Sequence, residues 1–264
     1  MKIKFPDVFI KYCRNIQNWN EKLLGSRRYK KFVIISDART GSTLLAQLLN
    51  SHPQIVCFGE KFKKLDSYPS SKIWSGIFRK RHRKIKWVGF KLFYFHPVQG
   101  IDKDIWNILA EDEEVVVIHL MRNNILRSYV SKKIGLQTRL WTKTPRDPDE
   151  IELKDKKVYL PPDECIETFK TIEKYYQETK KRFKSHKIIP VFYEDLSRNK
   201  QKEMNSLFKE FGVLPYEVSS TMIKQNPENL NDLIINYYEL KEQFSGTKWE
   251  RFFYHDTNQT FSPS

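Results

Sequence analysis

The chain has 264 residues, and its 47 Lys and Arg against 32 Asp and Glu give a formal net charge of +15. With 39% hydrophobic and 14% aromatic residues it can bury a substantial core, which excludes a globally disordered protein. The length predicts a single domain over residues 1–264, with a helical extension at 1–30. The charge favours anionic partners: nucleotides, acidic glycans, nucleic acid, or an anionic membrane surface contacted peripherally.

The cysteines and the start of the chain exclude several classes of protein. Cys13, Cys57 and Cys165 are widely spaced and form no CxxC pair, which argues against a structural metal or a disulfide framework. No apolar leader follows the first residues, and no run approaches the roughly 20 apolar residues of a membrane span. We therefore expect a cytoplasmic protein with no bound metal and no transmembrane segment.

Hydrophobic periodicity divides the chain into alternating helices and strands. Residues 5–24 have helical spacing between Pro6 and Gly25, which favour a helix start and a helix stop. The runs that follow predict strands at 32–36, 55–58, 87–94, 115–120 and 188–193, and helices at 43–49, 101–110, 125–135, 163–183 and 200–211. This alternation predicts a three-layer α/β/α fold around a mostly parallel sheet. The charged segment 139–161 lacks periodicity and predicts a long surface loop on the substrate side.

The turn after the first expected strand has the composition of an anion-binding loop, and it reads Arg39, Thr40, Gly41, Ser42 and Thr43. The N–H groups of a helix's first turn lack internal partners, and the helix dipole adds partial positive charge, so an anion fits there. Gly41 lets the backbone approach the anion, and the fork of Arg39 suits phosphate or sulfate oxygens. The fold is therefore expected to be P-loop-like. However, no Lys precedes Ser42 in the spacing of a nucleoside-triphosphate P-loop, which disfavours ATP or GTP.

Several motifs resemble one enzyme family. Residues 39–45, Arg-Thr-Gly-Ser-Thr-Leu-Leu, and residues 48–60, which end in Phe-Gly-Glu, resemble the donor-binding loop of sulfotransferases that use 3′-phosphoadenosine 5′-phosphosulfate (PAPS). The resemblance continues through Ile-His-Leu-Met-Arg-Asn-Asn at 118–124, Tyr-Glu-Asp-Leu at 193–196 and Lys-Gln-Asn-Pro at 224–227. It covers residues 30–250 and is strongest to bacterial carbohydrate sulfotransferases that modify lipo-oligosaccharides and trehalose glycolipids. It implies transfer of a sulfuryl group from PAPS to a carbohydrate or glycolipid hydroxyl, with PAP as the second product.

PAPS carries a 3′-phosphate, so its enzymes need a second anion pocket. Arg122 follows the strand expected at 115–120 and precedes a helix, a position that suits a bidentate phosphate contact. In the resembled family this Arg is paired with a Ser of the next helix. Ser131 fits the bacterial pattern, and Ser128 is the alternative. Lys224 resembles a late residue that closes over the nucleotide.

Sulfuryl transfer requires in-line geometry, stabilisation of charge on the leaving group and a base for the acceptor hydroxyl. Glu60 resembles the proposed base of the family. His52 and His96 compete for this role: His52 lies in a Ser-His-Pro helix stop, whereas His96 follows the strand at 87–94 and suits substrate binding or auxiliary acid–base work. Lys91 resembles a Lys that neutralises the bridging oxygen, a role shared with Arg39. These cations could act without a metal.

Two other functions, a kinase and a nucleic-acid-binding protein, are each compatible with part of the sequence. A P-loop-type kinase is opposed by the missing Lys. A non-catalytic nucleic-acid-binding protein is supported by the net charge and by the basic run at 79–86, but it leaves the two anion sites unexplained, and no nucleic-acid partner is expected. The basic run is interpreted as a solvated face, or as a contact for an acidic glycan, a lipid headgroup or a nucleic acid. The acceptor could also be a peptidyl tyrosine or a small metabolite, and we expect segments 61–86 and 139–161 to select it.

Overall fold

The structure, a computed structural model, describes residues 25–65, 68–98, 104–144 and 152–254. The helix expected at 5–24 and Cys13 lie outside these residues. Within the described part of the chain, no helix has both the length and the apolar character needed to cross a membrane.

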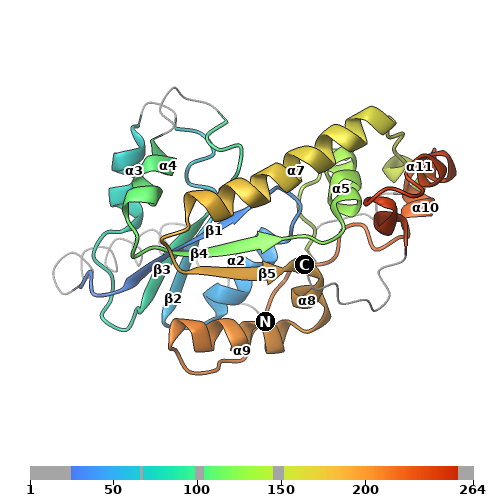
Figure 1. Ribbon diagram of the computed structural model, residues 1–264. Coiled ribbons are helices and arrows are strands. Elements are labelled where there is room, and N and C mark those ends of the chain that lie inside the picture. The colour runs from blue at the N-terminus through green and yellow to red at the C-terminus, as the bar shows by residue number, and fades with distance from the viewer. Residues whose placement is uncertain (1–24, 66–67, 99–103, 145–151, 255–264) are drawn as a thin grey trace.

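Five strands form a parallel sheet in the middle of the molecule (Figure 1). In the order β2-β3-β1-β4-β5, every neighbouring pair is parallel, which confirms the predicted α/β fold. The strands are β1 (Lys30–Ser36), β2 (Ile55–Phe58), β3 (Trp87–Phe93), β4 (Val116–Met121) and β5 (Ile188–Phe192). The predicted strand ends agree with these bounds within two residues, and Tyr193 begins a helix instead of ending β5.

Helices connect the strands and extend the chain beyond the sheet. They are α2 (Ser42–Ser51), α3 (Ser70–Ile77), α4 (Ile105–Glu111), α5 (Ile125–Thr138), α6 (Leu153–Lys156), α7 (Pro162–Arg182), α8 (Tyr193–Arg198), α9 (Lys200–Phe211), α10 (Leu230–Leu233), α11 (Tyr237–Gln243) and the 3-10 helix η1 (Glu250–Phe253). The predicted helices at 43–49, 125–135, 163–183 and 200–211 are confirmed as α2, α5, α7 and α9. Helices α3, α6, α8, α10 and α11 were not predicted, because eight residues or fewer show little of the helical period.

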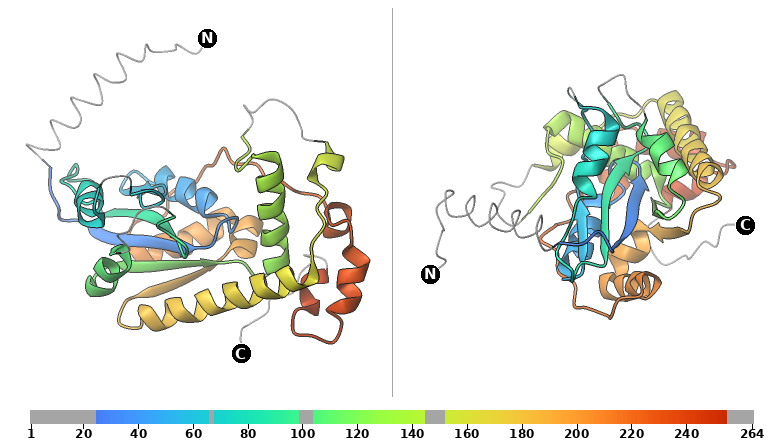
Figure 2. Two further views of the ribbon diagram at one scale, coloured as in Figure 1. Left: turned by 90° about the horizontal axis from the view of Figure 1, so that it is seen from above. Right: turned by 90° about the vertical axis from the view of Figure 1, so that its left-hand side faces the viewer.

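Different helices cover the two faces of the sheet (Figure 2). Along β1, Phe32 and Ile34 pack into a core with α2 and α9, whereas Val33 and Ile35 pack on the other face with α3, α4 and the end of α7. Alternating side chains of one strand therefore serve two cores, and β1 is buried on both faces. A third core joins α5 and α7 to α10, α11 and η1, beside the carboxyl edge of the sheet.

The segment expected to be a surface loop, 139–161, differs from the prediction in its second half. It contains α6, and Val158 pairs with Ile234 in a parallel bridge. Val158 and Leu160 are buried in the third core. The prediction missed this because alternation over four residues, 157–160, is too short to stand out among charged neighbours.

Candidate active site

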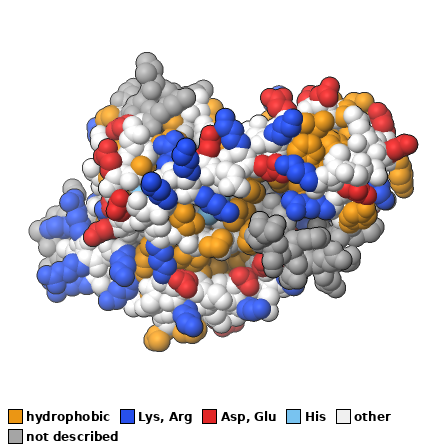
Figure 3. Space-filling view, viewed as in Figure 1, with side chains coloured by type: hydrophobic (Ala, Val, Ile, Leu, Met, Phe, Trp, Pro, Cys, Tyr) orange, Lys and Arg blue, Asp and Glu red, His pale blue; other side chains and the backbone are white. Residues whose placement is uncertain are grey.

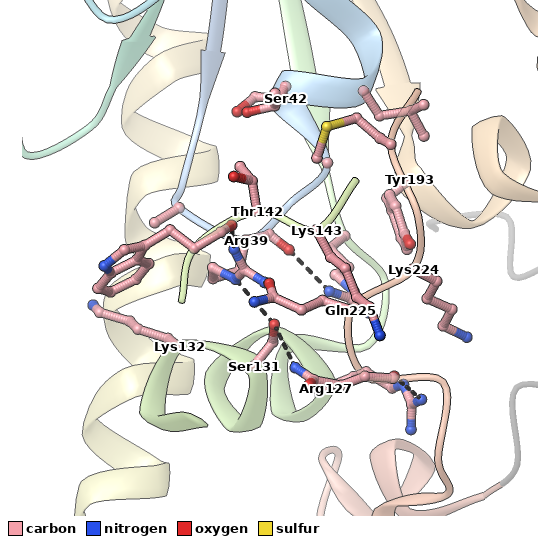
Figure 4. A pocket seen from close by; sticks show the side chains of 18 of the residues that line it. Arg39, Ser42, Arg127, Ser131, Lys132, Thr142, Lys143, Tyr193, Lys224 and Gln225 are labelled. Carbon is pink, nitrogen blue, oxygen red and sulfur yellow. Dashed lines mark hydrogen bonds between the residues drawn. The ribbon is translucent and has the colours of Figure 1, made fainter. Parts of the chain in front are cut away.

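A cavity of about 520 Å³ opens at the carboxyl edge of the sheet. Its lining includes a residue that follows each strand: Ala38 after β1, Glu60 after β2, Phe95 after β3, Arg122 after β4 and Tyr193 after β5. Ligands of open α/β sheets bind at this edge, because the loops that can vary and the helix N-termini meet there. Side chains from α5 and from the segment around residue 225 close the cavity on the side away from the sheet (Figure 4).

The N-terminus of α2 faces this cavity without a side-chain cap. Gly41 is the N-cap, with a φ of 84°, and the first helical hydrogen bond runs from Leu45 N to Gly41 O. The N–H groups of Ser42 and Thr43 precede that bond, so they remain available to an anion, and the helix dipole favours negative charge there. A Cβ at position 41 would lie 2.4 Å from Cδ2 of Tyr193, so only glycine fits. This geometry is compatible with the anion-binding loop predicted at residues 39–43, which stays a prediction.

Unlike the rest of the loop, Thr40 and Arg39 use their side chains to bond to other parts of the protein. Thr40 is buried, and its hydroxyl donates to the carbonyl of Asp37 at 2.7 Å, which holds the turn. Arg39 has a φ of 66°, and its Nε donates to Ser131 Oγ at 3.0 Å. Its other guanidinium nitrogens donate to Trp141 O and Gln225 Oε1, so Arg39 ties the loop to α5 and to two later segments. Burial, together with the charge of Arg122, lowers the pKa of Arg39.

Arg122 is held at the same cavity by several contacts. Its Nη1 donates to the carbonyl of Arg39 at 2.9 Å, and its guanidinium lies 4.5 Å from the ring centroid of Tyr193. Nε lies 3.8 Å from Glu194 Oε1. The hydroxyl of Tyr176 accepts from Arg122 N at 3.1 Å and holds the backbone of the turn. This cation is therefore fixed beside the loop at 39–43, as a second anion pocket requires.

The structure distinguishes the two candidate serines. Ser131 lines the cavity, and its hydroxyl accepts from Arg39 Nε and from Asn226 Nδ2 at 3.3 Å. Ser128 is buried, does not line the cavity, and donates to the carbonyl of Ile125 at 2.8 Å. Lys224 lines the cavity with an exposed side chain. Ser131 and Lys224, and not Ser128, thus line the cavity.

Glu60, Lys91 and His96 form one cluster below the N-terminus of α2. Lys91 Nζ lies 3.0 Å from Thr43 Oγ1 and 3.4 Å from Glu60 Oε1. The side chains of Phe90 and Leu92 pack into the core that contains α3 and α4. Because successive side chains of a strand point to opposite faces, Lys91 points to the face of the sheet that α2 covers. The lysine thus connects the expected base to the expected anion loop.

His96 completes the cluster as a neutral ring. Its Nδ1 accepts from Phe93 N at 3.3 Å, so the proton of the neutral ring lies on Nε2, which is 3.8 Å from Glu60 Oε2. Burial lowers the pKa of His96 to about 4, with Glu60 opposing this shift and the charges of Lys63 and Lys91 adding to it. At neutral pH the ring is therefore uncharged and presents an N–H toward the carboxylate.

His52 takes the structural role that its helix-stop motif predicted. It is buried as the C-cap of α2, its Nδ1 accepts from Gln54 N at 3.1 Å, and its ring packs on Phe208. Its Nε2 lies 3.2 Å from the carbonyl of Leu214. Because both nitrogens have backbone partners away from the cavity, His52 is not a base for this site.

The basic run at 79–86 does not line the cavity. Arg81 is buried, its backbone pairs with Ser26, and its Nη2 donates to the carbonyl of Ile77 at 2.9 Å. The other Lys and Arg residues of the run are exposed or half-buried. On the face shown in Figure 3, Lys and Arg side chains are spread among Asp and Glu rather than gathered into a stripe.

Sequence reasoning missed several residues that complete the site. Tyr193 packs on Gly41 and Arg122, and Arg127 donates to the carbonyls of Asn226 and Glu228 at 3.0 and 2.6 Å, which holds the segment that carries Lys224. Tyr193 lies in a motif of the resemblance, so that signal was present. Arg127 sits in a helix of mixed pattern, and nothing in the sequence links it to residues a hundred positions later. Among the described residues, no group of three His, Cys, Asp or Glu side chains is placed to hold a metal ion.

The chain is similar to known proteins along most of its length. It is 28% identical over 247 residues to Nodulation protein H of Rhizobium tropici, covering 84% of this chain and 92% of that protein. It is 25% identical over 241 residues to Nodulation protein H of Rhizobium meliloti (strain 1021), with 84% and 94% covered. No family model matches the chain.

Two solved structures are also similar. One is a sulfotransferase from Alicyclobacillus acidocaldarius, with a TM-score of 0.47 and 13% identity over 81% of this chain and 90% of that one. The other is the sulfotransferase domain of the Synechococcus PCC 7002 olefin synthase, with a TM-score of 0.40 and 16% identity over 90% and 91%.

Proposed function

We propose that the protein transfers the sulfuryl group of PAPS to a hydroxyl of a carbohydrate or glycolipid, with Glu60 as the general base. The observation that supports this proposal is the meeting of an uncapped helix N-terminus, a buried arginine and a carboxylate in one cavity. The uncapped α2 N-terminus and Arg122 flank the loop at 39–43, and Glu60 lies beside it, linked through Lys91 to Thr43.

The proposed donor contacts follow from the positions of these groups. The N–H groups of Ser42 and Thr43 would bind the 5′-phosphosulfate, which needs donors and partial positive charge but no P-loop Lys. Arg122 and Ser131 would bind the 3′-phosphate, with Lys224 closing over the nucleotide. ATP lacks that second phosphate, so a site with two oxyanion pockets fits PAPS better than ATP.

The proposed reaction is an in-line displacement at sulfur. As the acceptor oxygen bonds to sulfur, its proton passes to Glu60, and the bond from sulfur to the bridging oxygen breaks. The negative charge that develops on the bridging oxygen stays on PAP, where the ammonium of Lys91 and the hydroxyl of Thr43 stabilise it. His96 Nε2 lies 3.8 Å from Glu60 Oε2 without a hydrogen bond, so a small movement of the carboxylate would let this N–H hold it in place.

A carbohydrate acceptor is supported by the resemblance of the motifs to bacterial carbohydrate sulfotransferases. The similarity to Nodulation protein H along most of both chains agrees with it. Protein and metabolite hydroxyls are the alternatives.

The function is tested by incubating the protein with labelled PAPS and a panel of cell-envelope glycans, followed by mass analysis of the products. We expect a mass gain of one sulfate ester on a glycan and release of PAP. PAP at 100 times its Kd should also raise the free energy of unfolding by about 2.7 kcal/mol, because it binds only the folded chain. Stabilisation by ATP with magnesium but not by PAP would support a kinase instead, and steeply salt-dependent RNA or DNA binding without a PAP effect would support a nucleic-acid-binding protein.

A further inference from the structure

The cavity carries more positive charge than the donor needs. Among the described residues that line it, Glu60 is the one carboxylate, and eight are Lys or Arg: Arg39, Lys63, Arg122, Arg127, Lys132, Lys143, Lys200 and Lys224. PAPS carries about four negative charges, counting nearly two for a phosphate monoester and two for the phosphosulfate. A cavity lined in this way attracts anions by its summed field, so the surplus charge calls for a second anionic group.

Two of these cations lie near the reacting cluster rather than near Arg122. Lys63 is close enough for its charge to lower the pKa of His96. Lys132, on α5, has its Nζ 5.9 Å from the ring centroid of Phe95, and the Phe95 ring lies 5.2 Å from that of His96. In Figure 4, Lys132 lies on the opposite side of Arg39 from Tyr193 and Lys224.

Neither ammonium group is neutralised within the described part of the chain. Lys63 and Lys132 form no ion pair there, although their neighbours do: Lys133 pairs with Glu164, and Lys91 with Glu60. The acidic group that responds to Lys132 is Asp37, a buried carboxyl whose pKa is raised by burial and lowered by that lysine, and no ion pair joins them. Two lysines that line the cavity near His96 and Phe95, without an ion pair among the described residues, form a natural anion subsite.

Aromatic side chains are exposed at the same mouth. Phe95 is 39% exposed and Trp141 is 44% exposed, and both line the cavity. The indole of Trp141 packs against α5 at Gly135, where an added Cβ would lie 3.2 Å from the ring, and its carbonyl accepts from Arg39. The ring faces carry negative charge density, which attracts the C–H faces of a sugar. A rigid, half-exposed aromatic surface beside the base is suited to hold a sugar ring.

From these observations, and on the basis of the proposed function, we propose that the acceptor is an anionic glycan. Phe95 and Trp141 stack on the sugar that carries the acceptor hydroxyl, while Lys63 and Lys132 bind a carboxylate, phosphate or sulfate group on it or on its neighbour. The lysines set acceptor specificity and do not take part in binding the nucleotide.

The test measures binding to the protein saturated with PAP, by calorimetry at fixed ionic strength, for two matched pairs of glycans. The first pair is a hexasaccharide of alternating glucuronic acid and N-acetylglucosamine and its methyl ester, which keeps every hydroxyl and loses the charge. The second is chitohexaose with and without a 6-phosphate. We expect at least one anionic member to bind about tenfold more tightly than its neutral partner, since each exposed ion pair contributes a few-fold. A difference in the first pair would identify a carboxylate as the bound group, and a difference in the second pair would identify a phosphate.

Three variants assign the effect to residues. The double variant Lys63→Ala/Lys132→Ala should bring the two members of that pair within twofold of each other while the Kd for PAP stays unchanged. Lys84→Ala/Lys86→Ala, on the exposed run outside the cavity, removes the same charge and should leave the preference intact. Phe95→Ala should weaken both members equally.

Equal binding of both members of each pair, or no binding of either anionic glycan, would overturn the proposal, as would a double variant that weakens PAP as much as the glycan. These outcomes leave the proposed function standing, because PAP binding and sulfation of a neutral glycan would be retained. Loss of PAP binding by the unaltered protein would remove the proposed function itself.

Discussion

The two ends of the cavity are built in different ways. At the donor end, Arg122 is buried, and its backbone, its guanidinium and the neighbouring Gly41 each have a defined protein partner, among them Tyr176 and Tyr193. At the proposed acceptor end, the side chains of Phe95 and Lys63 are exposed and form no hydrogen bond or ion pair among the described residues. A rigid, hydrogen-bonded donor end suits a single cosubstrate, whereas an open mouth made from loops lets acceptor choice vary without disturbing the nucleotide site.

The largest expected effect is on turnover, and it comes from replacing Glu60, which lies between the two ends of the cavity. Glu60→Gln keeps the shape of the side chain and removes its ability to accept a proton. Turnover should fall by roughly 10²–10⁴-fold, the usual contribution of general base catalysis. The Kd for PAP, measured by calorimetry, should stay within about threefold of the unaltered protein because Glu60 makes no proposed nucleotide contact. Full activity in this variant would exclude Glu60 as the base.

The next effect tests the rigidity of the donor end. Gly41→Ala adds a Cβ 2.4 Å from the ring of Tyr193 at a φ of 84°. We expect the free energy of unfolding to fall by about 2 kcal/mol and the affinity for PAP to fall with it. Gly76→Ala is the matched control, since a Cβ on that α3 residue would meet nothing within 4 Å. Wild-type stability and PAP affinity in Gly41→Ala would show that the turn is not the tight anion loop described here.

A smaller effect concerns the buried ring that supports the base. The pKa of His96 is lowered to about 4 by burial, whereas histidine in the unfolded chain titrates near its ordinary value of 6.5. Between these values the unfolded chain binds more protons, so stability should rise with pH from about 4 to 6.5. His96→Asn should reduce this rise by on the order of 2 kcal/mol, measured by urea unfolding across the window. His119, whose pKa is also lowered to about 4 by burial, accounts for part of what remains. An unchanged slope in the variant would mean that His96 is protonated in the folded state.

The smallest effect compares two serines on one helix. Ser131→Ala should weaken PAP binding about tenfold, the lower end of what one hydrogen bond to a charged phosphate contributes. Ser128→Ala should leave PAP binding unchanged, because its hydroxyl is bonded to the carbonyl of Ile125 within α5. Calorimetric titration of both variants gives the comparison directly, and a larger loss for Ser128→Ala would reverse the assignment.

The donor end could largely be read from the sequence, and the acceptor end could not. Residues 39–43, Arg122 and Glu60 lie where strand and helix patterns meet, so local periodicity located them and the motif resemblance named their roles. The resemblance favoured Ser131 and left Ser128 as the alternative, and separating them required the orientation of α5, which a helix with buried residues on most sides does not reveal. The contacts of Arg39 with Trp141 and with Gln225 span 102 and 186 residues, and no local pattern encodes such contacts. Pairing of Val158 with Ile234 was missed for the same reason.

A crystal structure with bound PAP tests the central claim most directly. The account predicts one PAP molecule with its 5′-phosphate against the N–H groups of Ser42 and Thr43, its 3′-phosphate on Arg122 and Ser131, and Glu60 facing the space where the sulfuryl group would lie. A PAP molecule bound elsewhere, or one that leaves either the α2 N-terminus or Arg122 without a phosphate, would contradict it.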